Sequence, residues 1–170
     1  LFPFFAEAQR TQDGISAYNQ KKYNKSFRLL YAPSKNGDRI AMYYIGRMLI
    51  EGGQAISPDI LKGHKFIKKA AKKNYSPAIY YLIESYSRKS SKLGENTKRA
   101  IQYADQLCKQ KDDRACAKKA QLLVRQPNRI DRENGCLDFK KLYDDRGEES
   151  AAYPVAYCIL EKIIPGSPTK

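Results

Sequence analysis

Apolar residues between positions 36 and 86 recur three and four positions apart, a spacing that predicts α-helices with one apolar face. Two such helices flank a turn with two adjacent glycines, Gly52 and Gly53, so this stretch is expected to form a helical hairpin. The apolar positions of its helices are Ala41, Ile45, Met48 and Leu49, then Phe66, Ile67, Ala70 and Ala71.

The pattern repeats about every 37 residues, because alanines stand at the same point of successive segments, at Ala41, Ala78, Ala115 and Ala152. This period is typical of helix-turn-helix repeats that stack on one another. The sequence therefore predicts an all-α protein, an α/α solenoid of about four hairpins and a C-terminal capping helix. The hairpins are expected near residues 11–36, 38–74, 76–107 and 113–146, and the capping helix after Gly147.

Glycine and proline positions support these boundaries. Asn36-Gly37-Asp38 combines a helix stop with the next N-cap. A tight reversal between antiparallel helices favours a positive φ, which Gly52 or Gly53 can adopt at low cost. The last helix contains Pro154, which could instead mark its first turn.

These residues resemble Sel1-like repeats, the tetratricopeptide-related hairpins of about 36 residues. The resemblance covers roughly residues 12 to 162 and is clearest in the second hairpin. The resemblance weakens in the third hairpin, where Ile83 replaces the glycine of this motif. It also weakens in the fourth hairpin, which has Lys119-Ala120 in place of Ile45-Gly46. The matching positions are Ala41, Ile45-Gly46, Met48-Leu49, Gly52-Gly53, Asp59, Lys69-Ala70-Ala71 and Asn74.

The resemblance implies a non-enzymatic interaction module whose first helices line a concave, protein-binding surface. Such proteins often act as adaptors or assembly factors in bacterial envelopes, and some resemble immunity proteins that neutralise secreted toxins. By register, the concave positions here are Tyr44, Arg47, Tyr81, Glu84, Lys118 and Gln121.

Four cysteines lie in the last two hairpins. Cys108 is expected near the end of one helix and Cys116 near the start of the next, so a short turn would bring them together. Cys136 is expected to start a second helix and to face Cys158 near the end of the following one. The first spacing also resembles that of disulfide-containing, secreted Sel1-like proteins. The residues alone leave free thiols or metal ligation open, although CxxC spacing is lacking.

Residues 1–8 are apolar and close in Ala6-Glu7-Ala8, as the end of a secretory signal peptide does. The alternative is an N-terminal segment that packs its phenylalanines on the first helix. The signal interpretation predicts a periplasmic or secreted protein, with the repeat domain at residues 9–164 and a tail at 165–170. No apolar run approaches the roughly 20 residues that cross a bilayer.

The chain has 32 basic and 18 acidic side chains and a formal net charge of +14. Most of the excess precedes residue 100, and such a field favours an acidic protein partner. A patch of lysines is expected on one helix, either as a solvated outer face or as a binding surface. An envelope polyanion or nucleic acid is an alternative ligand. The patch comprises Lys62, Lys65, Lys68, Lys69, Lys72 and Lys73.

The sequence offers no arrangement of catalytic residues. His64 is the single histidine, and no motif supplies it with a nucleophile and an orienting carboxylate. The adjacent acidic pairs, such as Asp112-Asp113, fall at expected helix ends and suit capping. We therefore predict neither an enzyme activity nor a cofactor or metal.

Overall fold

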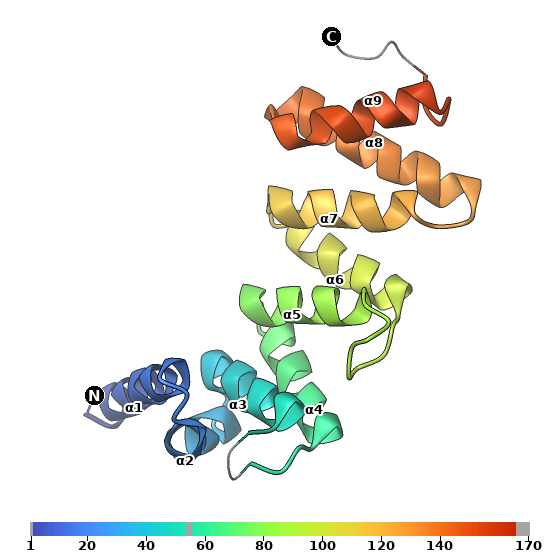
Figure 1. The fold of residues 1–170 in the computed structure, drawn as a ribbon. Coiled ribbons are helices and arrows are strands. Elements are labelled where there is room, and N and C mark those ends of the chain that lie inside the picture. Colours follow the sequence, from blue (N-terminus) through green and yellow to red (C-terminus); the bar gives the residue numbers. More distant parts are fainter. Residues whose placement is uncertain (1, 54–55, 166–170) are drawn as a thin grey trace. The chain divides into compact units, whose positions relative to one another are not determined.

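The computed structural model describes residues 2–53 and 56–165, with side chains from residue 7 onward. Leu1, the side chains of residues 2–6 and most of the predicted tail at 165–170 lie outside that description. The described part contains nine α-helices, one 3-10 helix and no β-strand (Figure 1). Their order is α1 (Phe2–Asn19), α2 (Tyr23–Lys35), α3 (Arg39–Glu51), α4 (Ile60–Lys72), α5 (Ser76–Tyr86), α6 (Thr97–Cys108), α7 (Asp113–Val124), α8 (Arg129–Arg146), η1 (Glu149–Ala151) and α9 (Ala152–Leu160).

The chain divides into two compact units. Unit 1 contains residues 1–85 and 90–94, and unit 2 contains residues 86–89 and 95–170. In unit 1, α1 packs on α2, α2 on α3 and α3 on α4. In unit 2, α6 packs on α7, α7 on α8 and α8 on α9. The single domain expected at residues 9–164 stays a prediction.

Alanines of the 37-residue period lie inside these units. Ala41, Ala78 and Ala115 are each the third residue of a helix, α3, α5 and α7, and all three are fully buried. Ala152 begins α9 and is partly exposed. An alanine lets neighbouring helices approach closely at this point, so its recurrence marks the same packing position in each repeat.

Aspartates cap two of these helices as the sequence predicts. Asp38 Oδ1 accepts hydrogen bonds from the backbone N–H groups of Ile40 and Ala41 at 2.8 and 3.1 Å. Asp112 Oδ1 accepts one from Ala115 at 3.0 Å. The turn glycine with positive φ is Gly52, at 74°.

Glycines allow the helices of a hairpin to touch through their backbones. A Cβ atom on Gly46 of α3 would lie 2.9 Å from the carbonyl oxygen of Gly63 in α4, and one on Gly63 would lie 2.7 Å from that of Gly46. In unit 2, a Cβ atom on Gly135 of α8 would lie 2.8 Å from the carbonyl oxygen of Ala120. Ala120 holds the place of Gly46 in the repeat, so the α7/α8 contact needs only one glycine.

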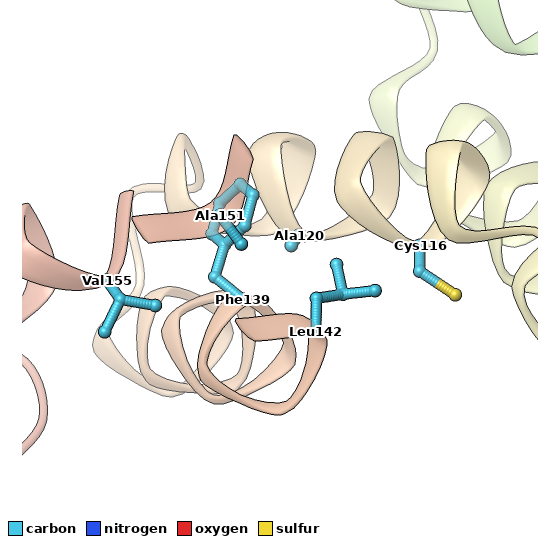
Figure 2. Close-up of a cluster of buried hydrophobic side chains, with 6 residues drawn as sticks. All are labelled: Cys116, Ala120, Phe139, Leu142, Ala151 and Val155. Atoms are coloured by element: carbon cyan, nitrogen blue, oxygen red, sulfur yellow. The ribbon is translucent and has the colours of Figure 1, made fainter. Parts of the chain in front are cut away.

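Unit 2 is held together by an apolar cluster and two disulfides. Figure 2 shows the cluster, whose side chains come from α7, α8, η1 and α9: Cys116, Ala120, Phe139, Leu142, Ala151 and Val155. The disulfides join Cys108 to Cys116 and Cys136 to Cys158, the pairs that the sequence predicts.

Two expected positions were wrong. Cys136 lies in the middle of α8, because this helix begins at Arg129, seven residues earlier than a helix that starts at the cysteine. The first helix begins at Phe2 and not at residue 11, since the helical backbone continues through the polar residues that follow Ala8. The signal-peptide interpretation of residues 1–8 stays a prediction.

Candidate functional site

A group of half-buried tyrosines lies on the first helices of unit 1, and we call it the tyrosine cluster. Tyr18 comes from α1, Tyr43 and Tyr44 from α3, and Tyr81 from α5, while Tyr75 directly precedes α5. The rings meet edge to face, the geometry that aromatic pairs prefer. Their centroids are 4.8 Å apart for Tyr18–Tyr44, 5.2 Å for Tyr43–Tyr44, 5.5 Å for Tyr43–Tyr75 and 6.3 Å for Tyr43–Tyr81.

Arg47 of α3 lies among these rings. Its guanidinium carbon is 5.7 Å from the ring centroids of Tyr18 and Tyr81 and 5.9 Å from that of Tyr43. Its Nε and Nη2 both donate to Oε1 of Glu51, at 2.9 and 2.7 Å. The arginine is therefore fixed by three rings and one carboxylate, while 31% of its side chain remains exposed.

The cluster has a defined ionisation state at neutral pH. Burial raises the pKa of Tyr18, Tyr44, Tyr75 and Tyr81 above the ordinary value, so these phenols stay protonated. Burial alone would lower the pKa of Arg47, but the hydrogen bond to Glu51 and the nearby tyrosines raise it. A charged arginine surrounded by neutral phenols can donate hydrogen bonds and present apolar ring surface at one place.

The structure brings three of the six predicted concave residues into this cluster, namely Tyr44, Arg47 and Tyr81. Glu84 is half-buried on α5 in the same unit. Lys118 and Gln121 lie on α7 in unit 2 and are partly exposed. A binding role for these residues stays a prediction.

Sequence reasoning missed Tyr18, Tyr75 and Glu51 as members of the site. Glu51 was detectable, because an Arg and a Glu four residues apart on a helix commonly pair. Tyr18 was not, because its contacts depend on how α1 lies beside α3. The partners of Tyr43 are tyrosines and Arg47.

The predicted lysine patch lies on α4 and its C-cap residue, Lys73. Four of its six side chains are exposed and those of Lys62 and Lys68 are partly exposed, whereas Phe66 and Ala70 are buried. The aromatic residues near the patch are Tyr31 and Phe66. The patch therefore has the exposed, outer-face character that the sequence allows, and its ligand stays a prediction.

Unit 2 contains a second basic region, a cavity of about 430 Å³ beside the Cys108–Cys116 disulfide. Here several of the charges are paired. Lys119 of α7 contacts Asp138 of α8 at 2.9 Å and Asp105 of α6 at 3.2 Å, and Lys109 contacts Asp105 at 2.7 Å. This network of ion pairs joins three helices, so a role in stabilising unit 2 explains why these charges lie together.

The described residues also bear on metal-binding and membrane-spanning functions. Over residues 2–53 and 56–165, no group of three or more His, Cys, Asp and Glu side chains is arranged to hold a metal ion. Among the helices of that same part, none is long and apolar enough to pass through a lipid bilayer. His64, the single histidine, is partly exposed on α4.

No protein-family model matches the chain, and no curated protein matches it. Solved structures do. One is a protective antigen of uropathogenic Escherichia coli with an SLR fold, at a TM-score of 0.69 and 22% identity over 92% of this chain. Another is a Sel1 repeat protein of Oxalobacter formigenes, at a TM-score of 0.66 and 20% identity over 89% of this chain. The chain spans 34% of the first of these proteins and 62% of the second.

Proposed function

Because the chain has the fold of a Sel1-repeat solenoid, we propose that it is a protein-binding module and that the tyrosine cluster with Arg47 is part of its binding surface. The observation that carries the proposal is the fixed position of Arg47 among three half-buried tyrosines. Tyrosine and arginine are enriched among the residues that contribute most of the binding energy in protein interfaces.

The side chains of the cluster are already ordered in the free protein, which lowers the entropy cost of binding a partner. Edge-to-face ring contacts and the bond to Glu51 already restrict the side chains that a partner would have to immobilise. Within the described residues, Nη1 of Arg47 has no hydrogen-bond partner. That edge can donate to a carboxylate or backbone carbonyl of a partner, while the rings provide apolar contact area.

The charge of the chain supports an acidic partner. Residues 1 to 100, which include the cluster, carry 19 basic and 7 acidic side chains. Such a field accelerates encounter with a protein of opposite charge. We propose a non-enzymatic role, as an adaptor or assembly factor, because the described residues offer a pre-ordered contact surface.

The two disulfides support a periplasmic or secreted location for this binding. Disulfides persist in oxidising compartments and are rare in the cytosol. Together with the apolar N-terminal sequence, they favour a partner that is itself exposed to the periplasm or the exterior.

The test is to identify a partner from native envelope extract by crosslinking at moderate salt and to measure its affinity for purified variants. We expect Tyr44→Ala/Tyr81→Ala to bind about tenfold or more weakly, since truncation removes central contacts. Tyr153→Ala/Tyr157→Ala is the matched control, because these α9 tyrosines are exposed in unit 2. Arg47→Lys keeps the charge and loses the planar group, so it should also weaken binding.

Unchanged affinity in a double variant with wild-type circular dichroism would overturn the assignment of the surface. An equal loss in the Tyr153→Ala/Tyr157→Ala control would also contradict it.

A further inference from the structure

Four lysines converge on a small cavity of unit 1 away from the tyrosine cluster. Lys35 is the last residue of α2, and Lys62, Lys65 and Lys69 follow one face of α4. These side chains and Phe66 line a cavity of about 130 Å³, which we call the lysine cavity.

Aromatic rings contact two of the ammonium groups. Nζ of Lys35 lies 5.6 Å from the ring centroid of Tyr31, and Nζ of Lys62 lies 5.7 Å from the same centroid. Nζ of Lys35 is also 5.8 Å from the centroid of Phe66. The rings provide modest cation–π attraction, but they bring no negative charge to the cavity.

The described part of unit 1 places no acidic side chain in an ion pair with any of these four lysines. The nearest acidic residue along α4 is its N-cap, Asp59, whose Oδ1 accepts the backbone N–H of Lys62 at 2.9 Å. The contrast is the cavity of unit 2, where Lys119 contacts two aspartates. The lysine cavity is therefore a concentration of uncompensated positive charge.

That arrangement costs stability in the free protein. Like charges three and four residues apart on a helix repel, which applies to Lys62 with Lys65 and to Lys65 with Lys69. Lys62 also lies in the first turn of α4, where the helix dipole disfavours a cation. A bound anion would remove both penalties.

We propose that the lysine cavity binds a diphosphate group, either free or as the headgroup of a lipid. A single carboxylate would neutralise one of four ammonium groups, whereas a diphosphate carries several charges and enough oxygens to accept hydrogen bonds from all four. Lysine is a point-charge donor that suits phosphate oxygens. This site is formed by the second helices, α2 and α4, so it does not depend on the proposed protein-binding surface.

The experiment titrates the oxidised full chain with pyrophosphate in solution and with farnesyl diphosphate in phosphatidylcholine vesicles. We expect saturable binding of at least one of them, and the one that binds more tightly identifies the source of the diphosphate. Lys62→Gln/Lys65→Gln should weaken binding about tenfold, because it removes two direct contacts. Lys72→Gln/Lys73→Gln removes the same charge from the end of the same helix, outside the cavity, and should change affinity at most about twofold.

Equal weakening in the two double variants would overturn the proposal, because it would show a response to net charge alone. Absence of saturable binding to both probes would overturn it as well. Amide shifts of α4 on binding, without shifts in α7, would support the location. These outcomes leave the protein-binding proposal untouched, since Tyr44 and Tyr81 are unaltered in every variant.

Discussion

The α3/α4 hairpin of unit 1 and the α7/α8 hairpin of unit 2 share a backbone plan but differ in how it is reinforced. Both begin with an aspartate cap three residues before a fully buried alanine. Both bring their two helices into backbone contact, through Gly46 and Gly63 in unit 1 and through Gly135 in unit 2. A few small and capping residues thus specify the repeat.

The surroundings of the two hairpins have opposite chemistry. Unit 1 has no cysteine, exposes the lysine cavity and fixes Arg47 among tyrosines. Unit 2 contains both disulfides and pairs Lys119 with Asp105 and Asp138. Unit 2 therefore uses its side chains for internal cross-links, whereas unit 1 leaves charged and aromatic side chains partly exposed.

The disulfide that closes the longer loop should contribute most to the difference between the units. Cys136 and Cys158 are 22 residues apart, and a bridge over such a loop stabilises by about 3 kcal/mol. We expect Cys136→Ala/Cys158→Ala to lower the free energy of unfolding of unit 2 by about that amount. Hydrogen exchange should show faster exchange in α8 and unchanged exchange in α3. Equal acceleration in both helices would show that the units do not unfold separately.

The two aspartate caps should make smaller contributions to the free energy of unfolding than the disulfide does. Asp112→Ala removes the capping bond to Ala115, whose loss should cost about 1 kcal/mol. Asp38→Ala should cost about 2 kcal/mol, because Asp38 Oδ2 also accepts the hydroxyl of buried Thr11 at 2.7 Å. Urea denaturation measures both costs, and Asp13→Ala, at an exposed residue of α1, is the control. A cost at Asp38 of only about 1 kcal/mol, the value expected for capping alone, would mean that the Thr11 contact adds nothing.

The charge network of unit 2 should contribute least to the free energy of unfolding. Burial alone would raise the pKa of the Asp105 carboxyl, but hydrogen bonds from Lys109 and Lys119 hold it below its ordinary value. A pKa that is lower in the folded state stabilises the protein above the unfolded pKa, about 3.9. This contribution is lost as the pH falls through the folded pKa.

The difference in unfolding free energy between the wild type and Asp105→Asn should therefore shrink below about pH 4. Denaturant unfolding at a series of pH values measures it. A difference that stays constant down to acid pH would contradict the proposed ionic origin.

Much of the fold could be predicted because its signals are local. Asn36-Gly37-Asp38, the recurring alanines and Gly52 each act within one turn or one helix. The Cys108–Cys116 pair was predictable for the same reason, since a short turn separates the two cysteines. The position of Cys136 within its helix was not predictable, because α8 is unusually long and begins well before the cysteine. It has 18 residues, whereas the other second helices, α2, α4 and α6, have 12 or 13.

The candidate sites were harder to predict, because they depend on contacts between helices. The periodic register identified Tyr44, Arg47 and Tyr81, but Tyr18 joins them from α1 by packing across the hairpins. The lysine patch was visible on α4, yet Lys35 of α2 completes the cavity. A sequence shows which residues share one helix. The contacts between side chains of different helices depend on rotamers and on how the helices pack.

The position of the cysteines also bears on how the chain matures during synthesis. Unit 1 contains no cysteine, so α1 to α5 can pack without a thiol of their own before Cys108 is made. Domains generally fold in the order in which they are synthesised, and contacts between neighbouring helices form quickly. Cys108 and Cys116 then appear eight residues apart, before Cys136 and Cys158. The order of synthesis thereby favours the native pairing, since Cys108 and Cys116 can react before Cys136 and Cys158 are made.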